Sequence, residues 1–125
     1  MTFRIFLCKR EALRVVGARV FARWTNGLYY KSFVSKSSLS SVSVTYDDGA
    51  KITLPKNDKA AVILDKIPEE DQVKIDQRVI AYWPSQVRYY PAYISQFCED
   101  GNKYLAKFDD GSERCQAIYE IRIVP

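Results

Sequence analysis

Two pairs of adjacent carboxylates are the first residues in the sequence whose type and spacing could do chemistry. Asp47-Asp48 and Asp109-Asp110 could act as the acid and base of a hydrolytic site. Each pair, however, directly precedes a glycine and lies between runs of alternating apolar residues, which is the composition of a tight turn. The chain also has no histidine, the commonest general base. We therefore predict that the protein is not an enzyme and has no catalytic residues.

The number and spacing of the three cysteines argue against a disulfide framework and against a zinc site. Cys8, Cys98 and Cys115 are odd in number and widely spaced, and the sequence has no CxxC pair. Without such a pair or any histidine, the ligands of a zinc site are missing. We therefore expect reduced, structural thiols, no metal and no cofactor.

The hydropathy pattern argues against a membrane protein. No apolar run approaches the ~20 residues that a membrane-spanning helix needs. The opening MTFRIFLCKREAL reaches charged residues before the apolar core of a signal peptide can develop. These two features predict a soluble protein that stays inside the cell and has no membrane partner.

Positive charge is concentrated at the amino-terminal end of the chain. The net charge is +4, but residues 1–36 carry eight Lys or Arg and one acid, whereas residues 37–125 carry eleven and fourteen. This asymmetry favours an anionic partner, DNA or RNA first, although an ordinary solvated face explains it as well. The residues that could neutralise phosphates are Arg4, Lys9, Arg10, Arg14, Arg19, Arg23 and Lys31.

The sequence contains two copies of one pattern. The stretch GARVFARWTNGLYYKSFV followed by VTYDDG recurs as DQRVIAYWPSQVRYYPAYI followed by LAKFDDGS. Both copies therefore have a tryptophan, a tyrosine pair and an aromatic-Asp-Asp-Gly turn in the same order. In a chain of 125 residues each copy is very small and would bury only roughly 60% of its unfolded surface alone. We therefore expect the two copies to share an interface.

Both copies are predicted to form strands, because Val, Ile, Tyr, Phe and Trp alternate with polar residues at a period of two. The predicted strands are Arg19–Arg23, Tyr29–Val34, Val42–Tyr46, Lys51–Leu54 and Ala61–Leu64 in copy one, and Arg78–Trp83, Tyr90–Gln96, Lys103–Phe108, Glu113–Ala117 and Ile121–Val124 in copy two. Five short strands close into a barrel that hides their edges. The predicted fold class is all-β, with two small five-stranded barrels in tandem.

The repeat also sets the predicted domain boundaries. Residues 17–66 form the first barrel, residues 67–76 an acidic linker that contains a proline, and residues 77–125 the second barrel. The serine-rich stretch from Ser32 to Ser43 is predicted to be a flexible polar loop. Residues 1–16 fit neither copy and form a basic extension, which could be an extra strand, a short helix or a partly disordered arm.

The order of tryptophan, tyrosine pair and aromatic-Asp-Asp-Gly turn resembles the Tudor domain family over residues 17–125. The run AVILDKIP between the copies is similar to the linker of tandem Tudor modules in chromatin-associated checkpoint mediators. The resemblance implies two SH3-like barrels and a nuclear protein. It also implies recognition of a methylated lysine, usually on a histone tail, through an aromatic cage on one barrel.

The resemblance carries the family's cage over to matching positions in both copies. In copy one these positions hold Trp24, Tyr30, Tyr46 and Asp48, with Ala50 where an aromatic can complete the cage. In copy two they hold Trp83, Tyr90, Phe108 and Asp110, with Ser112 at the fifth position. Both cages thus lack one aromatic wall, and the sequence does not indicate which barrel binds.

The chemistry of a methylammonium agrees with such a cage. Its positive charge is diffuse and weakly hydrated, and each cation–π contact contributes roughly 0.5–2 kcal/mol. Three such contacts and one charge-assisted hydrogen bond can support micromolar binding after the cost of association. Mono- and dimethyl-lysine keep an N–H that can donate to Asp48 or Asp110, whereas trimethyl-lysine has none. We therefore predict a preference for the lower methylation states.

Three other interpretations stay open. The aromatic residues could be ordinary core, because large aromatic side chains dominate the cores of small domains. They could instead stack DNA or RNA bases while the amino-terminal cations contact phosphates, although Asp48 and Asp110 would repel phosphate. A dimethylarginine side chain could enter the cages, although it suits a narrower and more aromatic cage. We rank a methylated protein tail first and nucleic acid as an auxiliary partner.

Overall fold

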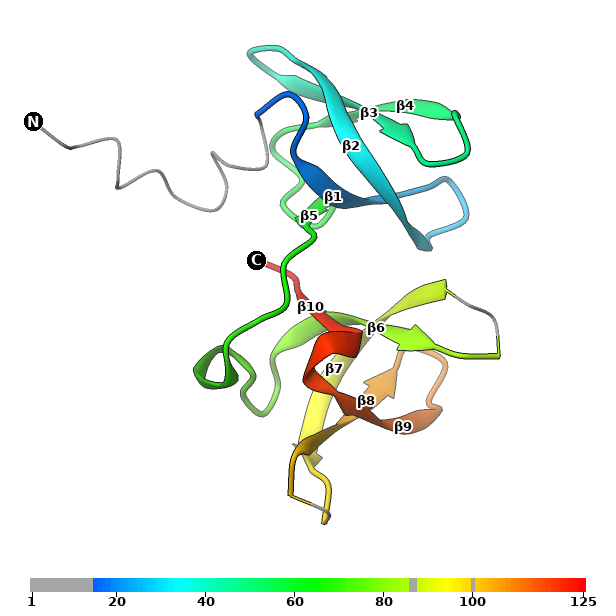
Figure 1. The fold of residues 1–125 in the computed structure, drawn as a ribbon. Coiled ribbons are helices and arrows are strands. Elements are labelled where there is room, and N and C mark those ends of the chain that lie inside the picture. The colour runs from blue at the N-terminus through cyan, green and yellow to red at the C-terminus, as the bar shows by residue number, and fades with distance from the viewer. Residues whose placement is uncertain (1–14, 86–87, 100) are drawn as a thin grey trace, which may run out of the picture.

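The computed structural model describes residues 15–85, 88–99 and 101–125, and its strands all pair in the antiparallel direction (Figure 1). The first copy of the repeat forms β1 (Arg19–Arg23), β2 (Tyr29–Ser37), β3 (Ser41–Tyr46), β4 (Lys51–Pro55) and β5 (Val62–Leu64). The second forms β6 (Arg78–Trp83), β7 (Arg88–Phe97), β8 (Lys103–Phe108), β9 (Glu113–Ala117) and β10 (Ile121–Ile123). Two single-turn 3-10 helices, η2 (Glu70–Gln72) and η3 (Ile118–Glu120), complete the described elements. The predicted all-β class is confirmed.

Each copy closes into a small barrel in the same way. Strands β1 to β4 form a meander, and β5 returns to pair with β1 in the register Val20↔Leu64. Strands β6 to β9 repeat the meander, and β10 returns to β6 in the register Ile80↔Arg122. Figure 1 shows the two barrels one above the other, with β10 between them. The tandem of five-stranded barrels predicted from the repeat is confirmed.

Alternating burial explains why these sequences form strands. In β3 the side chains of Val42, Val44 and Tyr46 point into the first barrel, whereas the intervening residues are partly exposed. The second barrel has an equivalent core, to which Phe108 contributes from β8. Because residues two apart share one face of a strand, this alternation fixes which residues can face outward. The last inward residue of β3 and of β8 is therefore the aromatic residue that precedes each Asp-Asp-Gly turn.

The serine-rich stretch forms a hairpin, so the prediction of a flexible loop from Ser32 to Ser43 is wrong. Strand β2 continues to Ser37 and β3 begins at Ser41, with a short turn between them. On the exposed face, the hydroxyls of Ser43 and Thr53 lie 2.9 Å apart and link β3 to β4. A serine-rich sequence does not by itself favour a strand. Here, however, the serine hydroxyls form hydrogen bonds across the strands, and the valines on the opposite face are buried in the core.

The prediction of reduced thiols is also wrong for two of the three cysteines. Cys98 and Cys115, which are 17 positions apart in the sequence, form a disulfide with their Cα atoms 6.2 Å apart. The β7–β8 and β8–β9 hairpins bring the two positions together. Cysteine spacing in the sequence does not reveal this pair, because the hairpin register determines it. Cys8 lies outside the described residues.

A third apolar cluster joins the two barrels. It consists of buried residues from both copies: Phe21, Tyr29 and Ile63 from the first, and Ile80 and Val124 from the second. Next to this cluster, Tyr29 of β2 pairs with Tyr89 of β7, so that the strands of both barrels form one continuous sheet. The expected shared interface is therefore present.

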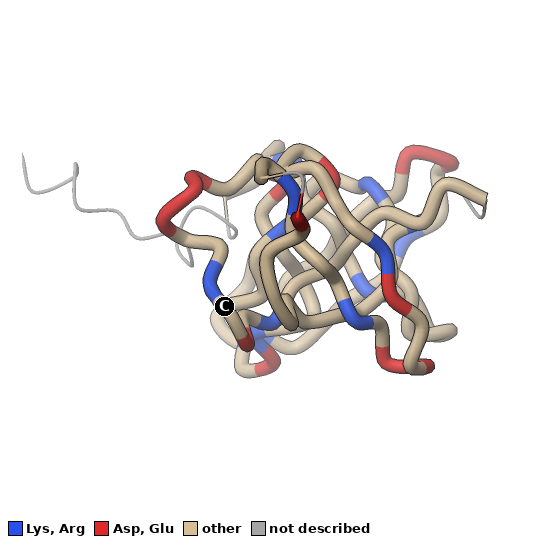
Figure 2. The backbone as a smooth tube through the Cα atoms, turned by 90° about the horizontal axis from the view of Figure 1, so that it is seen from below, with Lys and Arg blue, Asp and Glu red and all other residues tan. Residues whose placement is uncertain are grey.

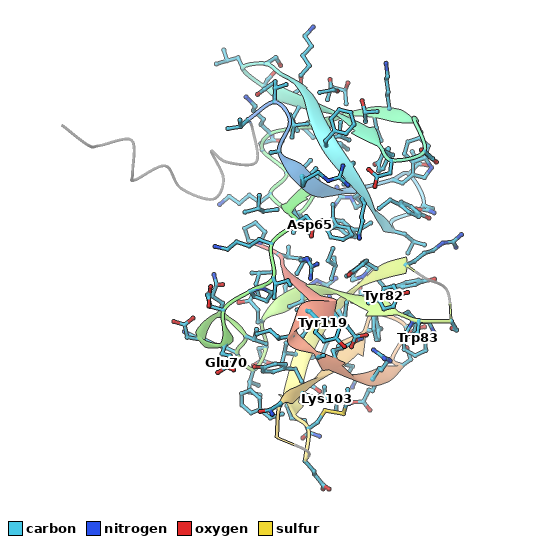
Figure 3. All side chains as sticks on the ribbon, in the orientation of Figure 1. Asp65, Glu70, Tyr82, Trp83, Lys103 and Tyr119 are labelled. Atoms are coloured by element: carbon cyan, nitrogen blue, oxygen red, sulfur yellow. A yellow bond between two sulfur atoms is a disulfide. The ribbon has the colours of Figure 1, made fainter. Side chains whose placement is uncertain are left out.

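A buried ion pair crosses the same interface. Arg122 of β10 is only 8% exposed, and its Nε donates a 2.9 Å hydrogen bond to Oδ1 of Asp65. The guanidinium lies 5.6 Å from the ring centre of Phe21 and 5.8 Å from that of Tyr89. Figure 3 shows Asp65 between the two barrels. The arginine is thus held by a carboxylate and two aromatic rings from both copies.

The charged residues of the described chain are mixed in sign. In Figure 2 Lys and Arg segments and Asp and Glu segments are interspersed over the molecule. None of the helices in the described ranges is long and apolar enough to cross a membrane. The five strands of each copy lie within residues 17–66 and 77–125, and the division into domains at those boundaries remains our proposal. The predicted extension falls almost entirely on residues 1–14, outside the described residues.

Candidate functional site

The four predicted cage residues of the first barrel line one pocket. Trp24, Tyr30, Tyr46 and Asp48 surround a space of about 520 Å³. Ala50 also lines this pocket, at the fifth position, where an aromatic residue could complete the cage. The remaining lining residues are Asn26, Lys31, Asp47 and Arg88. Residues from the ends of β1, β2 and β3 therefore meet at one end of the barrel.

The ring of Tyr46 stands nearly at right angles to each of the other two aromatic rings of this pocket. The ring centre of Tyr46 lies 5.3 Å from that of Trp24 at 89° and 6.3 Å from that of Tyr30 at 81°. Tyr46 is only 5% exposed, whereas Trp24 and Tyr30 are half-buried. Tyr46 therefore forms the floor, and the other two rings form the walls.

The second barrel has an equivalent pocket. Trp83, Tyr90, Phe108 and Asp110 line a space of about 490 Å³, with Ser112 at the fifth position. The ring centre of Phe108 lies 5.1 Å from that of Trp83 at 88° and 6.4 Å from that of Tyr90 at 87°. Trp83 lies at the end of β6, at the edge of the barrel (Figure 3). The remaining lining residues are Gly27, Leu28, Pro91 and Asp109.

The two carboxylates of each Asp-Asp-Gly turn make different interactions: the first forms an ion pair and the second a hydrogen bond within the turn. The first aspartate binds an arginine at the start of the barrel, as Asp109 does with Arg78 at 2.7 and 2.8 Å. The second accepts a backbone N–H two residues ahead, as Asp110 does from Ser112 at 2.9 Å. The glycine then has a positive φ, which is 90° at Gly111. The turn chemistry predicted for these carboxylates is therefore confirmed.

The first barrel repeats this arrangement. Asp47 pairs with Arg19 at 3.0 Å, and Oδ1 of Asp48 accepts the N–H of Ala50 at 2.9 Å. In both turns the first aspartate is held by the arginine that begins the barrel. This contact orients the loop and places the second aspartate on the rim of the pocket. Each pocket therefore combines three aromatic rings with one carboxylate that has no arginine partner among the described residues.

Hydrogen bonding keeps the rim carboxylate of the second pocket ionised. The Ser112 hydroxyl lies 2.6 Å from Oδ1 of Asp110, and this bond, followed by the Ser112 N–H, lowers the pKa of Asp110 below its ordinary value. The neighbouring Asp109 also has a lowered pKa, mainly because Arg78 donates hydrogen bonds to it. Both carboxylates are therefore negative at neutral pH.

The floor of the first pocket differs from that of the second by one hydroxyl. Burial, followed by the nearby Tyr30 and Asp48, raises the pKa of Tyr46 to about 12. The Tyr46 hydroxyl is buried and has no hydrogen-bond partner among the described residues. Phe108 takes the equivalent place in the second barrel and has no such group. The floor of the second pocket is therefore purely apolar.

Of the residues predicted to contact nucleic acid, the three that the structure describes do not form one free cationic surface. Arg19 pairs with Asp47, and Arg23 pairs with Asp58. Lys31 is exposed at the first pocket. The other four residues, Arg4, Lys9, Arg10 and Arg14, lie outside the described residues. Two of the three described cations are thus neutralised within the barrel that carries them.

Sequence reasoning within one copy missed the residues that each pocket takes from the other barrel. Arg88 of β7 lines the first pocket, and Leu28 lines the second. The cause is the antiparallel pair Tyr29↔Tyr89, which brings Leu28 toward Tyr90 and Arg88 toward Tyr30. The alignment of the repeats places Leu28 and Arg88 at equivalent positions, but only the packing of the barrels reveals their role.

Metal chemistry has no candidate site in the described ranges. No group of three or more His, Cys, Asp or Glu side chains is placed there to hold a metal ion. The two pockets share aromatic faces and a rim carboxylate, and both kinds of group attract positive charge.

Comparison with known proteins finds a family model that matches the second barrel and solved structures that share the fold of the whole chain. Residues 75–122 match the family model described as the DNA repair protein Crb2 Tudor domain. A search of curated protein sequences finds no match. The crystal structure of Arabidopsis thaliana AGDP1 AGD34 is similar with a TM-score of 0.57 and 11% identity, covering 98% of this chain and 88% of that chain.

The crystal structure of ADCP1 tandem Agenet domain 3-4 is similar with a TM-score of 0.56 and 10% identity, covering 91% of this chain and 82% of that chain. At these identities the two structures show the fold alone. The expected resemblance to tandem Tudor domains is confirmed at the level of the fold: the chain is a tandem of Tudor-like barrels, and its second barrel matches the Crb2 Tudor family model.

Proposed function

We propose that this protein is a non-enzymatic chromatin reader, which binds a methylated lysine of a histone or another protein tail in an aromatic cage. Tudor and Agenet-like domains are commonly non-catalytic modules that read methylated peptides. The observation that carries the finer proposal is the gathering of tryptophan, tyrosine, a second aromatic and aspartate around one pocket in each barrel. A nuclear location follows from this proposed role.

The shape of the pockets supports a methylated ammonium as the ligand. Three rings, with the floor perpendicular to both walls, offer their faces and edges around a small compact group. A methylated ammonium is weakly hydrated, so its transfer into such a cage costs less than that of an unmodified ammonium. The rim carboxylate supplies the opposite charge. An unmodified lysine is therefore expected to bind much more weakly.

The rim carboxylates also support a preference for mono- and dimethyl-lysine. The turn hydrogen bonds of Asp48 and Asp110 are made by Oδ1, which leaves Oδ2 as an acceptor toward the ligand. A mono- or dimethylammonium can donate an N–H to that oxygen, and a charge-assisted bond is roughly twice as strong as a neutral one. A trimethylammonium has no N–H, so it can gain only the attraction between charges.

The pattern of burial argues against a purely structural role for the aromatic residues. Trp24 and Trp83 are only half-buried, and each packs against the rim of a core that valine, alanine and other residues complete. An aromatic residue kept only for the core would be buried like Phe21. The exposed parts of the two tryptophans are therefore available to a ligand.

A calorimetric titration tests this function. Peptides with un-, mono-, di- and trimethyl-lysine, and one with dimethylarginine, are titrated into the wild type and into Trp24→Ala and Trp83→Ala. Tyr119→Ala is the control, because Tyr119 is 62% exposed and lines neither pocket. We expect binding that depends on methylation and is lost in one of the two tryptophan variants. A DNA or RNA oligomer that binds when no peptide does would replace this proposal with the auxiliary one.

A further inference from the structure

We propose that the pocket of the second barrel is the one that takes the methylated cation, and that Arg88 determines this choice by keeping cations out of the first pocket. The inference rests on the function proposed above. It follows from the residues that each pocket receives from the other barrel, which are Arg88 in the first pocket and Gly27 and Leu28 in the second.

The two barrels exchange residues across their shared strand pair. Tyr29 of β2 and Tyr89 of β7 pair, and the next residues on either side continue toward the pockets. Arg88 thereby lines the first pocket and Leu28 lines the second. Because the two positions are equivalent in the repeat, the same geometry delivers a cation to one pocket and an apolar side chain to the other.

The charges around the first pocket oppose a cationic ligand. Lys31 and Arg88 both line it, and both are exposed without an ion-pair partner in the part of the chain that the structure describes. Of the two aspartates in the lining, Asp47 is already paired with Arg19. One unpaired carboxylate therefore faces two unpaired cations, and a methylammonium entering here would be repelled.

The charges around the second pocket favour a cationic ligand. Its lining contains Asp109 and Asp110 and no Lys or Arg among the described residues. Asp109 is paired with Arg78, which leaves Asp110 as the free carboxylate. The net charge that a ligand meets is therefore negative in the second pocket and positive in the first.

The apolar lining adds to this difference. Leu28 and Pro91 border the second pocket, where Phe108 forms the floor. Such a lining excludes water, and cation–π attraction strengthens when the cation is desolvated. At the first pocket, by contrast, the Asn26 amide donates a 2.9 Å hydrogen bond to the Tyr30 hydroxyl, which keeps the rim polar. Charge and solvation therefore point to the same pocket.

The indole N–H signals of the two tryptophans can report which pocket is occupied. The chain has two tryptophans, Trp24 and Trp83, one in each pocket. We would titrate a dimethyl-lysine peptide into the wild type and follow both signals by two-dimensional NMR, after assigning them with Trp24→Phe and Trp83→Phe. The expected result is a saturable shift of the Trp83 signal while the Trp24 signal stays still.

Exchanging the two equivalent residues then tests the cause. Leu28→Arg adds a cation to the second pocket and should weaken the binding reported by Trp83 at least about fivefold, because a unit charge a few ångströms away in a partly screened pocket has such an effect. Arg88→Leu should make the Trp24 signal shift as well. Arg88→Lys is the control, because it keeps the charge and should leave the Trp24 signal still.

The outcomes separate the inference from the function beneath it. A methyl-dependent shift of Trp24 alone in the wild type would leave the reader function standing and overturn our choice of pocket. Binding at Trp83 with no gain at Trp24 in Arg88→Leu would overturn the role of Arg88. A peptide that shifts neither signal in any of the variants would refute the proposed function, and the inference with it.

Discussion

At the scale of single residues, Tyr46 carries the one buried side-chain polar atom in the described ranges that has no hydrogen-bond partner. Its buried hydroxyl has no hydrogen-bond partner among the described residues, and the equivalent Phe108 lacks the group altogether. Leaving a buried polar group unpaired costs about 1–3 kcal/mol. The first barrel therefore tolerates a cost that the second barrel avoids.

The variant Tyr46→Phe should raise the free energy of unfolding by about 1 kcal/mol, because it removes the unpaired hydroxyl and keeps the ring. Chemical denaturation measures the change. Tyr29→Phe is the matched control, since the Tyr29 hydroxyl donates a 2.7 Å hydrogen bond to the carbonyl of Ala60 and its loss should destabilise the protein. A loss of stability in Tyr46→Phe would show that the hydroxyl is satisfied after all.

Ser112 sets the pH range over which the second pocket can bind a cation. The hydrogen bond from its hydroxyl lowers the pKa of Asp110 below the ordinary 3.8, so the carboxylate stays ionised until the pH falls below that value. Binding of a dimethyl-lysine peptide should therefore be constant from neutral pH down to roughly pH 4. In Ser112→Ala the pKa of Asp110 rises, and binding should weaken at a higher pH than in the wild type. Affinity measured against pH checks this, and identical profiles would contradict it.

At the scale of elements, an ion pair connects the first strand of each barrel to the Asp-Asp-Gly turn. Arg78 begins β6 and binds Asp109 of the turn that follows β8. The pair is nearly half exposed, so its contribution to stability is that of a surface pair, about 0.2–1 kcal/mol.

The Arg78–Asp109 ion pair makes the stability of the protein depend on pH. The pKa of Asp109 is lowered in the folded protein, so its stabilisation is fully present above the unfolded value of 3.8 and is lost as the pH falls through the folded value. Arg78→Gln should therefore be less stable than the wild type at pH 7, and the difference should vanish at strongly acidic pH. Thermal unfolding at several pH values measures both, and a difference that persists in acid would refute the assignment.

Many of the strands could be predicted from the sequence. Period-two alternation gave the bounds of β1, β6, β8 and β9 as the structure has them. It did not reveal that β1 and β6 bury both faces, because Phe21 and Ile80 are covered only by the packing of one barrel on the other. The serine-rich hairpin escaped prediction because its hydroxyls are satisfied across strands, which no local composition reveals. The Cys98–Cys115 pair and the role of Arg88 escaped for a related reason, since both depend on contacts between distant segments.

At the scale of the whole molecule, the two barrels are joined by a core that neither could bury alone. The shared cluster contains Phe21 and Ile80, both fully buried, and the Arg122–Asp65 ion pair lies beside it. Breaking a buried ion pair by removing one partner is costly, because the other charge remains buried without compensation. The interface is therefore part of the folded state of each barrel.

The two barrels should consequently unfold in one cooperative transition. Single-tryptophan variants Trp24→Phe and Trp83→Phe leave one fluorescent reporter in each barrel, and their denaturation curves should coincide. Arg122→Ala should lower the free energy of unfolding by roughly 3 kcal/mol, as reported by either tryptophan. If the two single-tryptophan variants, with no other substitution, unfolded at clearly different midpoints, the two barrels would not be a single cooperative unit.

The central claim of this account is that an aromatic cage binds a methylated lysine. The most direct test is a calorimetric comparison of one histone-tail peptide with and without dimethylation of its lysine, titrated into the wild type. We predict micromolar binding of the dimethylated peptide, much weaker binding of the unmodified one, and loss of the difference in Trp83→Ala. Equal affinities for the two peptides, or no binding of either, would contradict the claim.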